Sequence, residues 1–99
     1  MSSGVSVTRT GSFTSDGSAR SIRTLGFRPR VIKVINITSR DGFDWFAGMA
    51  DASALKTVAA GTRTAATTNG ITPLSDGFTV GADADVNANG ETVHWAAWE

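Results

Sequence analysis

The stretch VIKVINIT, residues 31–38, decides the fold of this 99-residue chain. Its apolar residues occupy both alternating faces, a pattern typical of a central β-strand that is covered on both sides. Pro29 lacks an N–H and keeps Arg28 out of helical space, so the chain turns a corner just before the strand. The stretch supplies four of the expected core residues, which are Val31, Val34, Ile35 and Ile37.

The segments on either side of this stretch also have the alternation of strands. Residues 5–15 alternate apolar and Ser/Thr positions, which indicates a half-buried strand. Asp16-Gly17 is a strong hairpin signal, so we expect residues 19–25 to return along the first strand. Residues 77–81 and 92–98 are the last two expected strands, and they add Phe78, Val93 and Trp95 to the expected core.

Turn signals recur along the chain, and no helical periodicity is sustained. Asn69-Gly70 and residues 87–90 (NANG) are further expected turns. Residues 51–60 fit a short helix capped by Asp51, a strand or a loop, and we favour a strand or loop. The pattern predicts an all-β fold, a small antiparallel β-sandwich or barrel with at most one short helix. We expect a single domain over residues 1–99, with residues 1–4 as a flexible N-terminal arm.

The composition argues against most kinds of catalytic and metal site. Leu, Ile, Val and Phe make up 21 of the 99 residues, which is enough for only a thin core. No cysteine is present, so thiolate metal sites and thiol nucleophiles are excluded, and the single His94 rules out a multi-histidine site. Nucleotide-binding and nucleophile-elbow motifs are missing as well. We therefore expect no enzyme activity and no cofactor. A secretory signal or an apolar stretch of bilayer length is not visible, and we expect no membrane partner.

One loop partly matches a calcium-binding motif. Residues 85–90 read DVNANG, the first half of such a loop. The bidentate carboxylate required at position twelve would fall on Ala96, inside an expected strand. The sequence therefore predicts an Asn/Gly turn with local hydrogen bonds and no metal site.

Charge is unevenly divided along the chain. The first forty residues carry a net charge of +6 and the remaining residues −6, and seven of the nine cations are arginine. Arginine suits bidentate pairing with carboxylates across an interface. Most aromatic residues, including all three tryptophans, lie in the acidic half and away from the arginine cluster, so we expect no nucleic-acid partner. Two tryptophans could offer an exposed aromatic surface. The candidate interface residues are Arg20, Arg23, Arg28, Arg30, Trp45 and Trp98.

Several short segments, in order, carry a family resemblance over about residues 11–98. They are GFRPRV at 26–31, Asn36, GFTVG at 77–81, NANG at 87–90 and WAAW at 95–98. Together they resemble a small β-domain of tailed-bacteriophage virion proteins, found in tail-fibre-type polypeptides and in short structural or decoration proteins. The resemblance implies a virion component that is not an enzyme, and it supplies no catalytic residues.

The resemblance leaves two functions open. Because the expected domain fills the chain and leaves no room for a fibre shaft, we expect a capsid decoration or cement protein. The alternative is a tail-fibre or fibre-tip protein that binds a host surface receptor or glycan. Under either interpretation the protein is located in the virion. The expected partners are the major capsid protein or tail components, together with further copies of the chain in a homo-oligomer.

Overall fold

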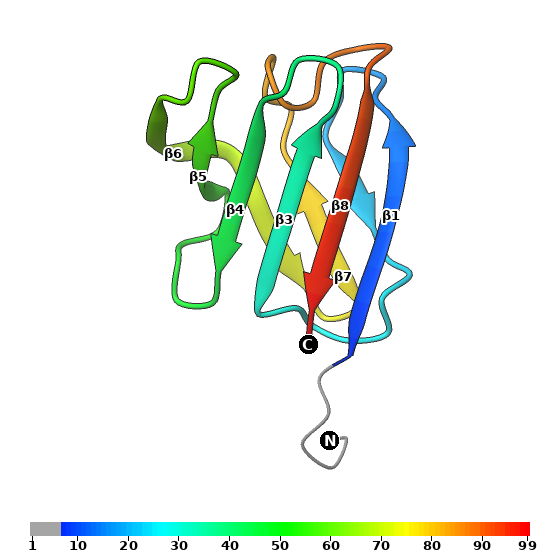
Figure 1. The fold of residues 1–99 in the computed structure, drawn as a ribbon. Helices are drawn as coiled ribbons and strands as arrows, with labels where there is room; N and C mark the ends of the chain where they lie inside the picture. Colours follow the sequence, from blue (N-terminus) through cyan, green and yellow to red (C-terminus); the bar gives the residue numbers. More distant parts are fainter. Residues whose placement is uncertain (1–6) are drawn as a thin grey trace.

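The computed structural model describes residues 7–99, and this part of the chain folds into eight β-strands without a helix (Figure 1). The strands are β1 (Thr8–Thr14), β2 (Arg20–Ile22), β3 (Val31–Asn36), β4 (Gly42–Phe46), β5 (Ser53–Thr57), β6 (Arg63–Leu74), β7 (Gly77–Val80) and β8 (Thr92–Trp98). The expectation of an all-β antiparallel fold is confirmed. Within residues 7–99, no helix is long and apolar enough to cross a membrane.

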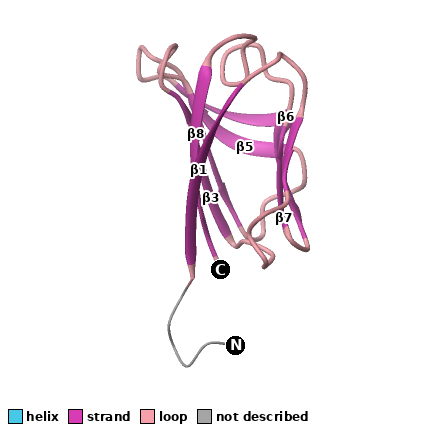
Figure 2. Cartoon of the chain, turned by 90° about the vertical axis from the view of Figure 1, so that its right-hand side faces the viewer, coloured by secondary structure: helices cyan, strands magenta, loops and turns pink. Residues whose placement is uncertain are grey.

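All eight strands belong to one antiparallel sheet, with the order β1-β8-β3-β4-β5-β6-β7-β2. The sheet curls into a half-barrel. β1, β8, β3 and β4 form one wall, which we call the front wall. β7, β2 and the second half of β6 form the back wall, and Figure 2 shows β5 and β6 crossing between the two. Strands from both ends of the chain therefore surround a common interior.

The corner between the walls lies where β5 pairs with β6. Ala54 pairs with Ala66, but the neighbouring Ser53 pairs with Ile71, so the register shifts at this point. Asn69, in the intervening stretch, has a positive φ of 56°. The expected turn at Asn69-Gly70 is therefore a bend within β6, and that prediction of a chain reversal is wrong. Gly70 keeps hydrogen bonds on both sides, to Ala52 O and from Gly81 N–H, so the strand pairing continues through the bend.

The core lies between the two walls. Side chains from β3, β4 and β8 meet others from β6 and β7, and the rings of Phe78 and Trp95 pack edge to face with centroids 5.3 Å apart. Four of the expected core residues are buried, which confirms Val34, Phe78, Val93 and Trp95.

The remaining expected core residues, which lie in β3 or directly after it, are not buried. Ile35 and Ile37 are 45% and 56% exposed, and Val31 is half-buried. β3 alternates strictly, with Ile32, Val34 and Asn36 directed inward. The prediction of a strand covered on both sides is wrong because, among residues 7–99, no second layer packs on the outside of the front wall.

The first two strands do not form the expected hairpin. β1 pairs with β8 in the front wall, whereas β2 pairs with β7 in the back wall. The reversal at Asp16-Gly17 exists, and its Asp16 carboxylate accepts a hydrogen bond from the Ser18 N–H at 2.9 Å. It carries the chain from one wall to the other. Residues 51–60 contain β5 and no helix, as favoured, while the expected arm at residues 1–4 lies outside the described residues.

Candidate interaction surface

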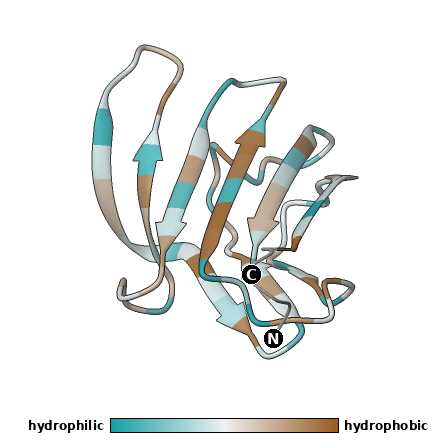
Figure 3. Cartoon of the chain, turned by 60° about the horizontal axis from the view of Figure 1, so that its bottom comes forward, coloured by the Kyte–Doolittle hydropathy of each residue, from teal (hydrophilic) through white to brown (hydrophobic). Residues whose placement is uncertain are grey.

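The outward-facing side of the front wall, which we call the outer face, carries apolar side chains that the core does not use. Figure 3 shows β3, at the centre of this wall, as mostly hydrophobic. The register places Val31 between Trp98 of β8 and Phe46 of β4, which makes one apolar row across the wall. Ile35 lies in a parallel row with His94. The large exposed apolar side chains found in the described part of the chain are Ile35, Ile37 and Phe46.

A hollow of about 440 Å³ opens in the outer face beside Ile35. It lies in the row formed by His94, Ile35, Gly42 and Thr57, at the position where Gly42 has no side chain. A Cβ added to Gly42 would lie 2.7 Å from the carbonyl oxygen of Val34. The close approach of the two backbones therefore requires glycine, and the missing side chain leaves room for one from another molecule.

A second hollow, of about 580 Å³, lies at the end of the same face. Arg30, Val31, Phe46 and Trp98 line it, and Lys33 borders both hollows. The Lys33 ammonium pairs with the Asp44 carboxylate at 3.6 Å between the two apolar rows. Two of the expected interface residues, Arg30 and Trp98, therefore meet here.

The other expected interface residues lie elsewhere. Arg20 and Arg23 are on and just after β2, where the Arg20 guanidinium lies 4.9 Å from the centroid of the Phe13 ring and Arg23 pairs with Asp76 at 3.1 Å. Arg28 is exposed on the loop before β3. The arginines therefore do not form one patch.

Trp45 must be removed from the candidate interface. Its side chain points inward from β4 and is only 3% exposed, and its Nε1–H donates to the carbonyl oxygen of Ala50 at 3.3 Å. The prediction that Trp45 contributes to an exposed surface is wrong. Trp45 and Trp98 each lie in a strand whose side chains alternate between two faces, and the sequence does not show which face of each strand is covered.

Two buried asparagines organise the loops at the opposite end of the half-barrel. The Asn36 side-chain amide donates to Val86 O at 3.1 Å and to Glu91 Oε1 at 2.8 Å. The Asn87 side-chain amide donates to Ser18 O at 2.8 Å and to Gly81 O at 3.0 Å, and its oxygen accepts from the Ser15 hydroxyl. These bonds satisfy both buried amides and tie the loop of residues 81–91 to two other segments, residues 15–18 and the end of β3.

An ion-pair cluster lies beside this loop. The Lys56 ammonium contacts Asp85 at 2.6 Å and Asp83 at 3.1 Å. Burial alone would lower the pKa of Lys56, but hydrogen bonds and attraction from Asp85 and Asp83 outweigh it and raise that pKa above 10.5. Burial would likewise raise the pKa of Asp83. Donation by the backbone N–H groups of Val86 and Asp85, with Lys56, instead lowers it below 3.8.

The partial calcium motif is occupied by protein contacts. Asp85 pairs with Lys56, and Asn87 is buried with its amide used by neighbouring backbone. Ala96, at the twelfth position, lies in β8. Residues 7–99 contain no group of three or more His, Cys, Asp or Glu side chains arranged to hold a metal ion.

Sequence reasoning missed the structural roles of Asn36 and Gly42. A signal for each exists: Asn36 is a polar residue in the most apolar strand, and Gly42 is a glycine next to a strand rich in large side chains.

Comparison of the chain with protein-family models, curated proteins and solved structures finds no match.

Proposed function

We propose that this chain is a non-enzymatic virion structural protein, a capsid decoration protein that binds the major capsid protein through its outer face. The observation that carries the proposal is the exposure of Ile35, Ile37 and Phe46 on one wall, at 45%, 56% and 43%. Large exposed apolar side chains on one wall are typical of a protein interaction site, because a soluble monomer gains nothing by exposing them.

The geometry of the outer face supports attachment to a regular surface. The side chains project from four paired strands with a fixed register, so their relative positions are held by backbone hydrogen bonds. The two hollows beside Ile35 and Phe46 can accept side chains of the capsid protein, which is how the most strongly binding residues of interfaces are seated. The protein acts in several copies, which together form a homo-oligomer on the virion.

Binding of a host glycan is the alternative function, and Trp98 is the observation that favours it. Trp98 is partly exposed in the hollow that also contains Phe46 and Arg30, an aromatic surface with a polar rim. With Trp45 in the core, this one site would have to provide the sugar contact.

A binding experiment with virions that lack the protein distinguishes the decoration function from glycan binding. We expect purified protein to co-sediment with such virions and to raise their resistance to heat. The double variant Ile35→Asp with Phe46→Asp should lose both effects, because its charges would be buried without partners. Thr67→Asp, an exposed change on β6, is the matched control and should bind like the wild type. Circular dichroism checks that each variant is folded.

The opposite result has a clear form. Binding of soluble protein to host cells, lost in Trp98→Ala and without affinity for virion heads, would overturn the decoration proposal in favour of a fibre tip. Unchanged head binding by the Ile35 and Phe46 double variant would show that the outer face is not the contact.

A further inference from the structure

The half-barrel is not closed, and its two terminal strands face each other across a seam. β1 and β2 stand at opposite ends of the sheet order, and among residues 7–99 neither has a second partner strand. Residues 9–12 of β1 and residues 20–24 line a common hollow of about 400 Å³, with Trp95 at its base. We call this hollow and the strand edges beside it the seam.

The backbone of β1 directs a full row of hydrogen-bonding groups toward the seam. Glu99 N–H donates to Val7 O and Ser15 N–H donates to Glu91 O, each at 2.9 Å, so the odd-numbered residues of β1 pair with β8. Hydrogen-bonded and non-bonded positions alternate along an antiparallel ladder. The N–H and C=O groups of the intervening residues therefore point away from β8, and these residues are Thr8, Thr10, Ser12 and Thr14.

The same reasoning applies to β2 on the other side. Gly81 N–H donates to Gly70 O, which assigns the odd-numbered residues of β7 to β6. Phe78 and Val80 must then bond to their partners in β2, Ile22 and Arg20. The backbone groups of Ser21, between those two, point into the seam.

Positive charge lines the seam on both sides. Arg9 projects from β1, and Arg20 and Arg23 project from the β2 side. Arg23 pairs with Asp76, but within residues 7–99 neither Arg9 nor Arg20 has a carboxylate within 4.0 Å. Gly11 makes room for the Trp95 indole on the inner side of β1, since a Cβ there would lie 2.5 Å from that ring. The unpaired edge of β1 therefore lies beside two guanidinium groups that are available for carboxylates.

We propose that the free edge of β1 binds an extended acidic segment of another protein by strand addition, with its carboxylates paired to Arg9 and Arg20. A long unpaired edge is usually protected in soluble proteins, and here the one charged side chain of β1 is Arg9. A second copy of this chain fits less well, because each of its free strands would bring another arginine to the seam. This site is separate from the outer face and does not depend on the function proposed for it.

The hydrogen-bonding half of the proposal is tested at Thr10. The probe is a capped seven-residue peptide of alternating threonine and glutamate, with its affinity for the full chain measured by fluorescence anisotropy. Thr10→Pro removes one N–H that points into the seam and none that the sheet uses, and proline is tolerated at such edge positions. We expect Thr10→Pro to weaken binding about tenfold. Thr10→Val keeps the N–H and should bind like the wild type.

The charge half is tested at Arg9. Arg9→Glu should weaken the same peptide about tenfold or more, because it replaces attraction with repulsion. Arg63→Glu, an exposed change on β6, is the control for net charge and should have little effect. This pair decides the question if Thr10→Pro proves unfolded by circular dichroism. Absence of binding to the wild type, equal binding by Thr10→Pro in its folded state, or equal binding of a threonine–lysine peptide would overturn the proposal.

Discussion

Asn36 shows how one polar residue connects distant segments of this fold. It occupies an inward position of β3 that the alternation would otherwise give to an apolar residue, and it is fully buried. Its side-chain oxygen accepts from the N–H groups of Thr38 and Ser39, while its amide donates across to the loop of residues 85–91. A buried amide with all its partners fixes a single arrangement of those loops.

Asn87 is the residue whose loss we expect to cost most at this end. Asn87→Ala removes the donors to Ser18 O and Gly81 O and should lower the free energy of unfolding by about 3 kcal/mol. Urea denaturation measures the change. Asn89→Ala, two residues away and exposed, should change it by less than about 0.5 kcal/mol. Equal effects of the two substitutions would contradict the structural role of Asn87.

The Lys56 cluster predicts a defined pH dependence of stability. The folded-state pKa of Asp83 lies below 3.8, so its contribution is present above that value and is lost as the pH falls through the lowered pKa. The pKa of Lys56 lies above 10.5, so its contribution is lost as the pH rises through the raised value. The stability difference between wild type and Lys56→Gln should therefore be largest near neutral pH and shrink toward both extremes.

Urea unfolding at a series of pH values measures that difference. Lys33→Gln provides the control, because the Lys33–Asp44 pair is more exposed and more strongly screened by solvent. A difference between wild type and Lys56→Gln that stays constant below pH 3.8 would show that Asp83 does not depend on Lys56.

At the level of the strands, local patterns predict where strands occur better than which strands pair. β8 and β7 follow directly from the alternation in their sequences. The pairing of β1 with β8 could not be predicted from local sequence. The turn at Asp16-Gly17 shows that the chain reverses there, but it does not show which strand pairs with β1. For β3, apolar residues on both faces indicate that both faces can be covered, but not that this chain covers them.

The candidate surface was also predictable only in part, because local patterns do not specify how the strands are arranged. The arginine count and the choice of Trp98 as a surface residue follow from the sequence, and Trp98 is partly exposed. The distribution of Arg20 and Arg30 over different surfaces depends on the curvature of the sheet. The hollow at Gly42 depends on the register of three neighbouring strands, which no local motif specifies.

The two faces of β3 should respond differently to substitution. Val34→Ala, on the inward face, should lower the free energy of unfolding by about 2 kcal/mol, since it leaves a cavity in the core. Ile35→Thr, on the outer face, should change it by less than about 0.5 kcal/mol because the residue is already 45% exposed and leaves no cavity in the core. Thermal melting of both variants makes the comparison. A larger loss for Ile35→Thr would mean that the outer face is covered within the isolated protein.

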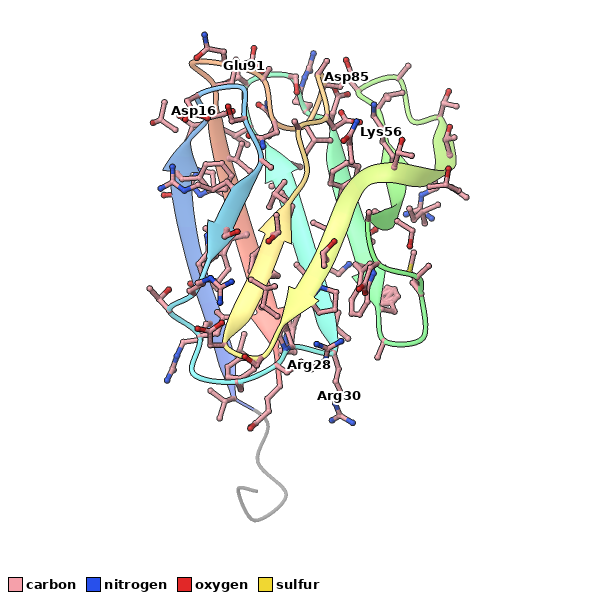
Figure 4. All side chains as sticks on the ribbon, turned by 180° about the vertical axis from the view of Figure 1, so that it is seen from behind. Asp16, Arg28, Arg30, Lys56, Asp85 and Glu91 are labelled. Atoms are coloured by element: carbon pink, nitrogen blue, oxygen red, sulfur yellow. The ribbon has the colours of Figure 1, made fainter. Side chains whose placement is uncertain are left out.

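Across the whole molecule, Arg28 and Arg30 lie at the end opposite to several acidic side chains. Figure 4 shows these two arginines at one end, and Asp16, Asp85 and Glu91 at the other, where Lys56 also lies beside Asp85. The molecule is elongated, with a longest extent of 40 Å. Two copies placed end to end would therefore bring opposite charges together. A head-to-tail contact of this kind generates a ring when the rotation closes and a filament when it does not.

We therefore predict that self-association of the protein weakens as the salt concentration is raised. Salt screens the attraction between the charged ends, and the screening length falls to about 8 Å at physiological ionic strength. Reversing Arg28 and Arg30 to Glu should reduce the oligomer further, because like charges would then meet at the contact. Sedimentation velocity measures the oligomeric state, and Arg63→Glu is the control for a change in net charge. An oligomer that survives the double reversal would mean that the end charges play no part in assembly.

The place of β8 in the sheet has a consequence for how the protein is made. β8 is the last strand in the sequence, yet it lies between β1 and β3, with a partner on each side. Until the ribosome has released residues 92–98, the first strand has nothing to pair with and the third has one partner only. The front wall therefore cannot form before residues 92–98 have been synthesised, and contacts between segments so distant in sequence form slowly. The nascent chain meanwhile exposes the unpaired edge of β3, so binding by a chaperone or rapid synthesis of β8 would protect it from aggregation.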